Sequence, residues 1–365
     1  MWRLFLAVAI GASGVWVQGR SVSVVATTLD DRLVEVLPRV LSSPHPYYPS
    51  YILNSYGFLT GNVNLDVELD PSGQVEHVEL KSAAHPAFVP WAMIALTRTK
   101  FSHAEFHGAP VACKFTYSFA FQVKNSSGHP VNRPPSIIPA QVKGVPPDLD
   151  YDFPPITDTF CVVPYPRHLM VENVHGSAKV RFVINQQGIV ESGEVLSASQ
   201  PEFGEALLGA VKTWRFIPAR KVVWPWKAAV IQSQDFDAER PDFERRVAKE
   251  LRRGGGDIVR MSDLDHPLKM VYFVKPDYPR ELQREGINGE VLIDAVITKE
   301  GQAVLPEVVS ATRPELRWPA MIAVSQWFFR PPTVKGQPVD VHARIPVEFV
   351  TEMPKNLLKL GPRRN

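Results

Sequence analysis

The chain has 365 residues, and hydrophobic residues make up 45% of it, a share typical of packed globular domains. Lys and Arg (40) nearly balance Asp and Glu (38), and no stretch combines a basic stripe with interleaved aromatic residues, which argues against a nucleic-acid-binding protein. The length predicts two or three domains.

The first predicted element is an export signal at residues 1–20. Arg3 supplies a positive charge near the start, and residues 4–17 are mostly apolar. Because crossing a bilayer takes about 20 apolar residues, this segment fits a signal peptide better than a spanning helix. Cleavage after Gly19 or Ala26 would release a periplasmic or secreted protein. An uncleaved inner-membrane anchor and a cytosolic N-terminal helix are the alternatives.

The rest of the chain repeats one pattern three times in phase. Each copy has a glycine, a second glycine twelve residues later, a Ser-Ala step, a phenylalanine after the predicted helix and another at the end of the last strand. The aligned positions are Gly61, Gly176 and Gly289; Gly73, Gly188 and Gly301; Ser82, Ser197 and Ser310; Phe101, Phe216 and Phe329; and Phe121, Phe236 and Phe349. The pattern predicts three modules, at residues 44–122, 161–236 and 270–350.

Each module opens with a Tyr-Pro step, which suits the start of a short helix. Alternating apolar residues after the first glycine predict a strand with one buried face, and the second glycine closes a hairpin. A helix with one apolar stripe follows, as in Phe203, Leu207, Val211 and Trp214. We interpret Trp214 and its counterpart Trp327 as core residues. Thr99 stands at this position in the first module, which should therefore pack differently there.

The last strand of each module is predicted at residues 111–121, 227–236 and 339–349. A hairpin, a helix and a returning strand give an α+β fold in which each module is a three-stranded antiparallel sheet, of order 2-1-3, with helices packed on one face. The last strand then lies at a sheet edge. Pro346 supports this placement, because proline is tolerated in sheets essentially only at edges.

Three further segments connect or follow the modules. Residues 123–160 are proline-rich and predict an extended, semi-rigid spacer. Residues 237–269 predict a charged linker helix, from Phe243, Val247 and Leu251 at helical spacing. Residues 351–365 form a basic tail.

The cysteines and histidines predict neither a metal centre nor a catalytic site. Cys113 and Cys161 are expected to be buried in separate modules, with a disulfide between them as the alternative. His103 and His107 flank Glu105, but the aligned prolines of the other modules place them in a turn after the helix. No nucleophile or phosphate-binding motif is present. We therefore expect a protein that is not an enzyme and has no cofactor.

The third module carries the clearest family motif: Tyr278-Pro279, Gly289, Gly301, Ser310 and Trp327-Phe328-Phe329-Arg330-Pro331. This succession resembles the C-terminal domain of the TonB energy-transducer family. The second module keeps Trp214-Arg215-Phe216-Ile217-Pro218, and the first is the most divergent. The resemblance implies a periplasmic domain that recruits a short extended peptide of an outer-membrane transporter alongside its last strand.

The resemblance implies an exported cell-envelope protein of tandem peptide-binding modules, linked to TonB-dependent transmembrane transport. Its partners would be envelope proteins or peptides, including TonB-dependent outer-membrane transporters, with no nucleic acid and with a membrane only through an N-terminal anchor. A membrane-anchored energy transducer and a structural envelope scaffold are the alternatives.

An open sheet edge offers unpaired N–H and C=O groups, and a partner strand satisfies them by β-augmentation. In the second module, Trp224-Pro225-Trp226 is expected to blunt the edge. The predicted peptide-binding strands therefore belong to the other two modules. Their predicted site residues are Cys113, Phe115, Tyr117, Phe119 and Phe121 in the first module, and Val341, Ala343, Ile345, Val347 and Phe349 in the third.

Overall fold

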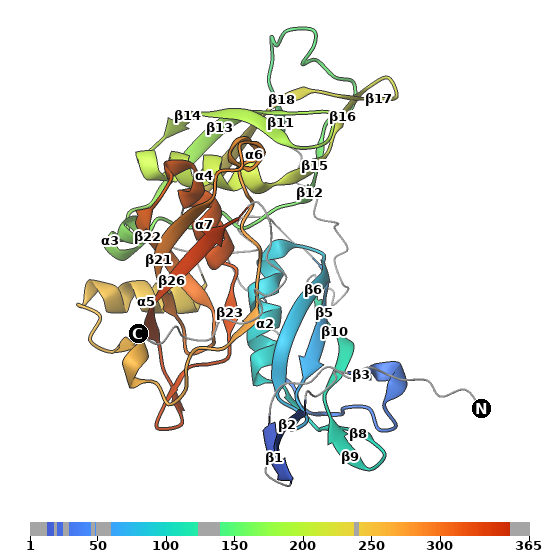
Figure 1. Cartoon of the computed structure of the whole chain (residues 1–365). Coiled ribbons are helices and arrows are strands. Elements are labelled where there is room, and N and C mark those ends of the chain that lie inside the picture. The colour runs from blue at the N-terminus through green and yellow to red at the C-terminus, as the bar shows by residue number, and fades with distance from the viewer. Residues whose placement is uncertain are drawn as a thin grey trace, which may run out of the picture. The chain divides into compact units, whose positions relative to one another are not determined.

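The computed structural model describes residues 13–17, 20–24, 29–44, 48, 60–122, 139–236 and 241–350, which form two compact units (Figure 1). Unit one comprises Met1–Pro135 with two short pieces of the third module, Lys269–Phe273 and Phe328–Arg330. Unit two comprises the rest of the chain. The mixed α+β class predicted from the sequence is confirmed.

The predicted export signal and basic tail lie mostly outside the described residues. Of residues 1–20, only two pieces are described, and β1 (Ser13–Val17) pairs with β2 (Arg20–Val24) in an antiparallel hairpin. Residues 351–365 and the spacer residues 123–138 are not described. Within the described ranges, every helix is too short or too polar to span a bilayer.

Unit one is built on a six-stranded sheet in the order β23-β20-β6-β5-β10-β3. Its strands are β3 (Leu29–Asp30), β5 (Gly61–Leu69), β6 (Val75–Ala83), β10 (Cys113–Phe121), β20 (Met270–Tyr272) and β23 (Phe328–Phe329). The smaller elements are η1 (Asp31–Leu33), β4 (Val40–Ser42), η2 (Pro86–Phe88), β7 (Lys100–Phe101), β8 (Ala104–Phe106) and β9 (Ala109–Val111). The helix α2 (Val89–Arg98) buries Trp91, Met93 and Leu96.

Unit two contains two four-stranded sheets, ordered β11-β18-β13-β14 and β19-β26-β21-β22. The first has β11 (Ala140–Gln141), β13 (Gly176–Ile184), β14 (Val190–Ala198) and β18 (Ala228–Phe236), and the second has β19 (Val259–Arg260), β21 (Gly289–Ile297), β22 (Ala303–Ala311) and β26 (Val341–Phe349). The helices are α3 (Arg167–Glu172), α4 (Pro201–Thr213), α5 (Asp242–Arg252), α6 (Arg280–Arg284) and α7 (Arg317–Val324), with η3 (Met261–Asp263) and η4 (Pro314–Leu316). The remaining short strands are β12 (Ile156–Thr159), β15 (Arg215–Ile217), β16 (Ala219–Lys221), β17 (Trp224–Trp226), β24 (Thr333–Val334) and β25 (Gln337–Pro338).

Each module places its first hairpin strand between the second hairpin strand and the last strand, as β6-β5-β10, β14-β13-β18 and β22-β21-β26. The prediction of three-stranded sheets is wrong, because short strands from the preceding arms join every one of them. A sheet edge with free backbone groups accepts any extended segment within reach. Residues 139–160, predicted as spacer, supply β11 in this way, and they also supply β12, which pairs with β15 in a separate two-stranded sheet.

Aromatic residues fill the space between helix and sheet in the same way in the first two modules. Phe88 stacks on Phe121 with ring centroids 4.3 Å apart, and Phe203 stacks on Phe236 at 4.2 Å. Tyr165 of the second Tyr-Pro step meets both Phe203 and Phe236 edge-on. The strand must come close to the helix here, and a Cβ atom at Gly176 would lie 1.8 Å from Ser199 Oγ. This contact explains the first glycine of the pattern.

The tryptophans at the helix ends belong to the core, as predicted. Trp214 and Trp327 are each 3% exposed, and Trp327 Nε1 donates to the carbonyl oxygen of Val274 at 2.8 Å. Thr99 replaces them in the first module, where its hydroxyl donates to the carbonyl oxygen of Ala95 at 2.8 Å. The Thr99 hydroxyl also lies 3.1 Å from that of Ser43, so the arm at 29–44 fills part of the space.

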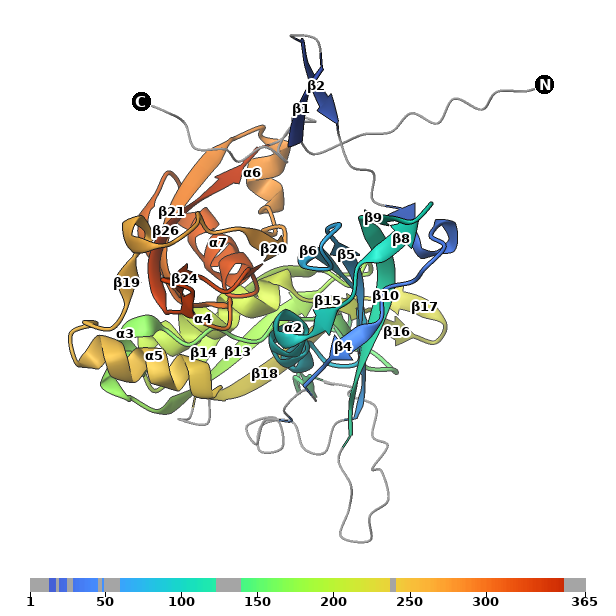
Figure 2. The same cartoon turned by 90° about the horizontal axis from the view of Figure 1, so that it is seen from below.

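The predicted linker helix is α5, and it packs on the third module. Phe243 and Val247 are buried. Arg246 binds the carboxylates of Glu300 at 2.8 Å and Asp340 at 3.1 Å. α5 also runs alongside α3 of the second module (Figure 2). This segment is therefore part of unit two.

Cys113 and Cys161 are both buried free thiols, one in each unit, and burial raises the pKa of Cys113 to about 11. His107 occupies the turn between β8 and β9, so the prediction that this histidine pair is not helical is confirmed. His103 Nε2 lies 2.9 Å from Glu105 Oε1.

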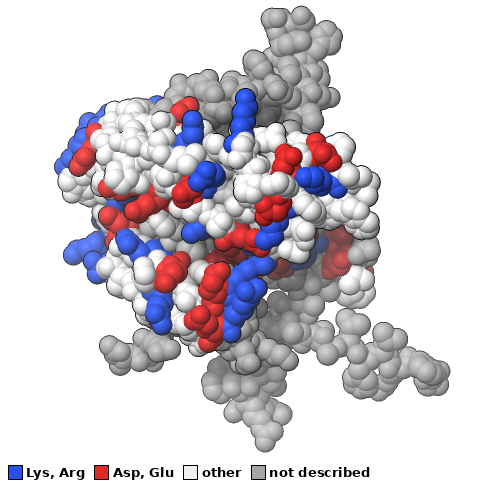
Figure 3. Space-filling view, turned by 90° about the horizontal axis from the view of Figure 1, so that it is seen from above, with Lys and Arg blue, Asp and Glu red and all other residues white. Residues whose placement is uncertain are grey.

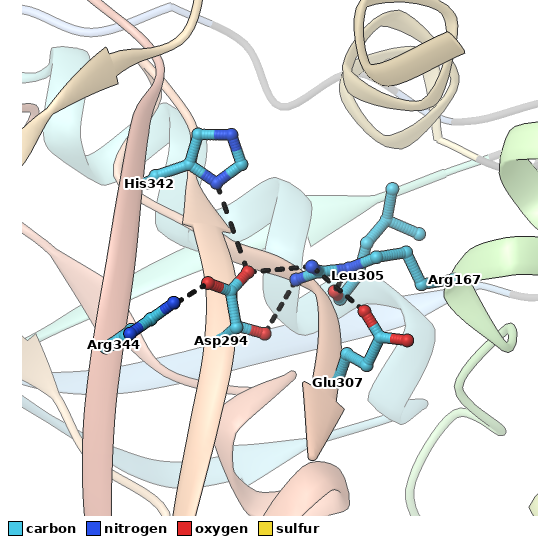
Figure 4. A network of polar contacts seen from close by, with 6 residues as sticks. All are labelled: Arg167, Asp294, Leu305, Glu307, His342 and Arg344. Atoms are coloured by element: carbon cyan, nitrogen blue, oxygen red, sulfur yellow. Dashed lines mark hydrogen bonds and ion pairs between the residues drawn. The ribbon is translucent and has the colours of Figure 1, made fainter. Parts of the chain in front are cut away.

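Modules two and three pack together within unit two. α4 meets α7 at Gly209, where a Cβ atom would lie 2.8 Å from the Trp318 ring. Arg167 of α3 reaches into the third module, where its side chain donates to the carboxylate of Asp294 at 2.7 Å and of Glu307 at 3.2 Å (Figure 4). It also donates to the carbonyl oxygens of Leu305 and Asp294, each at 2.6 Å.

Candidate peptide-binding strand edges

The outer edge of β10 is identified by the direction of its backbone groups. Successive residues of a strand direct their N–H and C=O groups to opposite neighbours. Ala84 N–H donates to the Asn62 carbonyl oxygen at 2.9 Å, so the even-numbered residues of β5 bond towards β6. The odd-numbered ones therefore bond to β10, where Tyr117 pairs with Leu65. Consequently the even-numbered residues of β10 direct their backbone groups outward.

The same reasoning applies to β26 of the third module. Thr312 N–H donates to the Glu290 carbonyl oxygen at 3.0 Å, so the odd-numbered residues of β21 bond to β26. Outward backbone groups on β26 then belong to its even-numbered residues, among them Pro346. Because proline has no N–H, its position at the edge removes no hydrogen bond to β21. It does remove one donor from the outer edge.

Short strands of the same chain cover the beginning of each edge. β3 pairs in parallel with β10 at Cys113 and Lys114, and β19 does so with β26 at Val341 and His342. In the second module, β11 pairs antiparallel with β18 at Val230 and Ile231. No other pairing partner within the described ranges occupies these edges. The outward-facing residues beyond the covering strands are Thr116, Ser118 and Ala120; Ser233 and Asp235; and Arg344, Pro346 and Glu348.

The ten residues predicted for the site lie on the inner face of the two sheets. Phe119, Phe121, Val347 and Phe349 are among those that are buried, and Phe115, Tyr117 and Ile345 are half-buried. Their backbone groups point to β5 and β21. Their side chains therefore anchor the edge strand to the core. The alternate residues carry the outward N–H and C=O groups that a partner strand would meet. The alternation of apolar and polar residues along each strand already separates the inner-face residues from the outward-facing ones.

The solvent face beside the β10 edge carries an ordered set of charges. Lys114 Nζ lies 2.8 Å from Glu79 and 3.2 Å from Glu68, and the hydrogen bond from Lys114 lowers the pKa of Glu79. Thr116 donates to Asp66 at 2.6 Å and accepts from Lys81 at 2.9 Å. On the face of the molecule in Figure 3, acidic and basic side chains are also interspersed.

The second module's edge differs from the prediction. Trp224-Pro225-Trp226 forms β17, which pairs with β16 in a separate hairpin, and the edge strand β18 begins at Ala228. The strand β11 covers its beginning instead. In the described parts of the chain, no group of three His, Cys, Asp or Glu side chains is placed to hold a metal ion.

Comparison with known proteins finds a family model that matches two of the three modules. The model of the Gram-negative bacterial TonB protein C-terminal domain matches residues 162–233 and 274–351. The Protein TonB of Vibrio cholerae serotype O1 is 31% identical over 90 residues, which are 24% of this chain and 37% of that protein. The chain thus spans just over a third of the length of this relative. The second and third modules therefore match the C-terminal domain of the TonB protein family, as the sequence pattern predicted, while the first module lies outside both matched segments.

Proposed function

We propose that this chain is an exported, non-catalytic cell-envelope protein whose first and third modules bind an extended polypeptide by strand addition to β10 and β26. The observation that carries the proposal is the run of outward-facing backbone groups at Thr116, Ser118 and Ala120. Past the two residues that β3 covers, nothing in the described chain pairs with them. The match of two modules to the TonB C-terminal family supports a binding role.

β10 is the better of the two edges on physical grounds. It offers three N–H and three C=O groups, whereas Pro346 leaves β26 with two N–H groups over the equivalent three residues. Main-chain pairing gives affinity with little demand on partner sequence. The short side chains of Thr116, Ser118 and Ala120 leave room for a neighbouring strand.

The partner class follows from the family and from the geometry together. An extended segment of about six residues would cover the free part of either edge. The resemblance to TonB makes the peptides of TonB-dependent outer-membrane transporters the first class to test, and with them a link to transmembrane transport. A periplasmic location after cleavage of residues 1–20 belongs to the same proposal.

The test compares two substitutions at Ser118 in the full chain. Ser118→Pro removes an outward N–H, and Ser118→Ala keeps it while removing the hydroxyl. With fluorescently labelled extended peptides from outer-membrane transporters, we expect Ser118→Pro to weaken binding about tenfold or more and Ser118→Ala to leave it unchanged. Equal binding by all three proteins would refute strand addition at β10. Thermal unfolding checks that the proline is tolerated, since Ser118 N–H makes no bond to β5.

A structural scaffold is the second candidate, and the covering strands β3, β11 and β19 favour it. They show that the chain supplies strands to its own edges. If labelled peptides bind neither the wild type nor any edge variant, the scaffold explains the architecture better. Determining the mature N-terminus separates a released protein from an anchored transducer.

A further inference from the structure

Each module carries a small hairpin between its helix and its last strand, and the three turns begin in the same way. The turns are His107-Gly108 between β8 and β9, Val222-Val223 between β16 and β17, and Lys335-Gly336 between β24 and β25. The first residue of each turn has a positive φ, of 53°, 57° and 50°.

The same type of contact stabilises all three turns. A carboxylate from the arm that precedes each module accepts the N–H of the first turn residue. The pairs are Glu35 with His107 at 3.0 Å, Asp152 with Val222 at 2.6 Å, and Asp265 with Lys335 at 2.8 Å. The first turn residues of the three hairpins are therefore directly comparable.

The second hairpin departs from the other two in its turn residues. The first and third turns place glycine second, where φ is 72° and 74°, and a polar residue first. The second turn holds Val222 at φ 57°, which is a genuine outlier for a β-branched side chain. The other two hairpins show that the fold does not require valine here. Strain retained at a surface turn is typical of a functional segment.

The strained turn displays three adjacent apolar side chains to solvent. Val222 is 68% exposed, Val223 67% and Trp224 70%. We name these three residues the apolar tip. Figure 1 shows β16 and β17 projecting beyond the end of β18, so the tip is convex.

Three cationic residues flank the apolar tip in the sequence. Arg220 and Lys221 precede it and Lys227 follows it. Lys221 Nζ lies 5.6 Å from the centroid of the Trp226 ring, and the Arg220 guanidinium lies 5.1 Å from that of Phe153. Of the neighbouring acids, Asp152 is engaged by Val222 N–H, and Glu191 binds Lys227 at 3.0 Å.

The size and chemistry of the tip favour a lipid surface over a protein partner. A stable protein interface needs about 800 Å² on each partner, and three side chains on a convex turn provide much less. A bilayer needs no complementary shape. Trp prefers the headgroup level of a membrane, and Lys and Arg lie beside it with their charges towards the phosphates. Both features occur at this hairpin.

We propose that the apolar tip inserts into the interfacial layer of a phospholipid bilayer and docks the second module on a membrane surface. Val222, Val223 and Trp224 enter the layer. Arg220 and Lys221 face the lipid phosphates, while Lys227 stays paired with Glu191. The strained turn holds the three apolar side chains away from the body of the module. This docking is independent of strand addition at β10 and β26.

The experiment uses the full chain with vesicles of phosphatidylethanolamine and phosphatidylglycerol that contain brominated lipid. Bromine quenches tryptophan only on close approach, and the difference between wild type and Trp224→Phe isolates the signal of Trp224. This local signal does not depend on the apolar residues 4–17. We expect clear quenching of Trp224 in the wild type.

The third module supplies the matched variant. Val222→Lys with Val223→Gly copies the Lys335-Gly336 turn and keeps Trp224, and we expect it to reduce the quenching of Trp224 at least about fivefold. Its thermal midpoint should equal or exceed that of wild type, because a β-branched side chain no longer occupies the position with positive φ. His107→Lys, which replaces one polar turn residue with another, is the control and should leave the quenching of Trp224 unchanged.

Two results would overturn the proposal. One is undiminished quenching in the double variant. The other is a wild type whose Trp224 is not quenched at all. If, in the second case, sedimentation shows self-association that the double variant abolishes, the tip serves a protein contact instead.

Discussion

The first and third modules place two acidic residues opposite each other at the same cross-strand position, and they neutralise them differently. Asp66 pairs with Glu79 in the first module, and Asp294 pairs with Glu307 in the third. Like charges directly opposite each other destabilise a sheet. The second module avoids the problem, since its pair is Arg181 with Glu194, joined at 2.7 Å.

The first module neutralises its acids with its own lysines. Lys81 lies 3.5 Å from Asp66, and Lys114 lies 2.8 Å from Glu79. The third module receives Arg167 from the second module, and this side chain is 12% exposed. Arg167 is thus one of the contacts that join modules two and three in one unit. The third module's own His342 and Arg344 approach Asp294 only to 3.9 Å, so the close counter-charge comes from the second module.

The largest expected effect comes from making the third module resemble the first at the helix end. Trp327→Thr removes a buried ring and its hydrogen bond to Val274, and should destabilise unit two by about 3–5 kcal/mol. Denaturant unfolding measures this. Trp224→Thr, at an exposed tryptophan, is the control and should change stability by less than about 0.5 kcal/mol. Similar losses in both variants would contradict the core role of Trp327.

Removing the charge of Arg167, which the second module supplies to the third, should have the next largest effect. Arg167→Met leaves two carbonyl oxygens and the Asp294–Glu307 pair without their main donor, and should cost about 2–3 kcal/mol. Lys114→Met in the first module, at a more exposed site, should cost at most about 1 kcal/mol. Both are read from denaturant midpoints.

A charge exchange sharpens the same comparison. Arg167→Met combined with Glu307→Lys gives the third module an opposite-charge pair like that of Arg181 and Glu194. Part of the lost stability should return. If the double variant is no more stable than Arg167→Met, repulsion between Asp294 and Glu307 is not the reason why Arg167 contacts the third module.

The two edges should become more alike when Pro346 is replaced. Pro346→Ala restores an outward N–H at the position equivalent to Ser118. One added hydrogen bond of about 1 kcal/mol predicts an increase of about fivefold in peptide affinity for the third module, with unchanged stability. Glu348→Ala, which alters no backbone donor, is the control. The prediction is contradicted if titration shows equal affinity for wild type and Pro346→Ala.

The smallest effect concerns pH and the turn of the third hairpin. The N–H groups of Gly336 and Lys335 hold the pKa of Asp265 below its ordinary value. Because the folded pKa is depressed, this contribution to stability is present above the unfolded pKa, near 4, and is lost as pH falls through the folded value. Asp265→Asn should therefore lose stability at pH 7 and show a shallower decline of the thermal midpoint below pH 5. Parallel declines in both proteins would contradict this.

The sequence predicted the elements that have a strong internal period. Alternation in Val63, Leu65, Val67 and Leu69 predicted β5, and the helical spacing from Phe203 to Trp214 predicted α4. The covering strands were missed because Leu29–Asp30 and Val259–Arg260 are too short for any period to appear.

Long-range contacts were missed for a different reason. Arg167 and Asp294 are 127 positions apart, and nothing local distinguishes this arginine from one in solvent. The aligned pattern places the two acids Asp294 and Glu307 opposite each other. This pairing could have predicted that a cationic side chain from elsewhere in the chain lies beside them. Of the apolar tip, only Trp224 was considered, as part of a sheet edge, because the hairpin that displays the three residues was not predicted.

One feature of unit one bears on how the chain is made. Its sheet is completed by β20 and β23, and Arg330 Nη2 donates to the carbonyl oxygen of Val75, 255 positions earlier. During synthesis, the ribosome must therefore release nearly the whole polypeptide before β6 gains its outer neighbours. Until then a nascent strand border is exposed to other chains. A fragment that stops at Pro135 would keep that border permanently, so shortened versions of this protein should aggregate where the full chain does not.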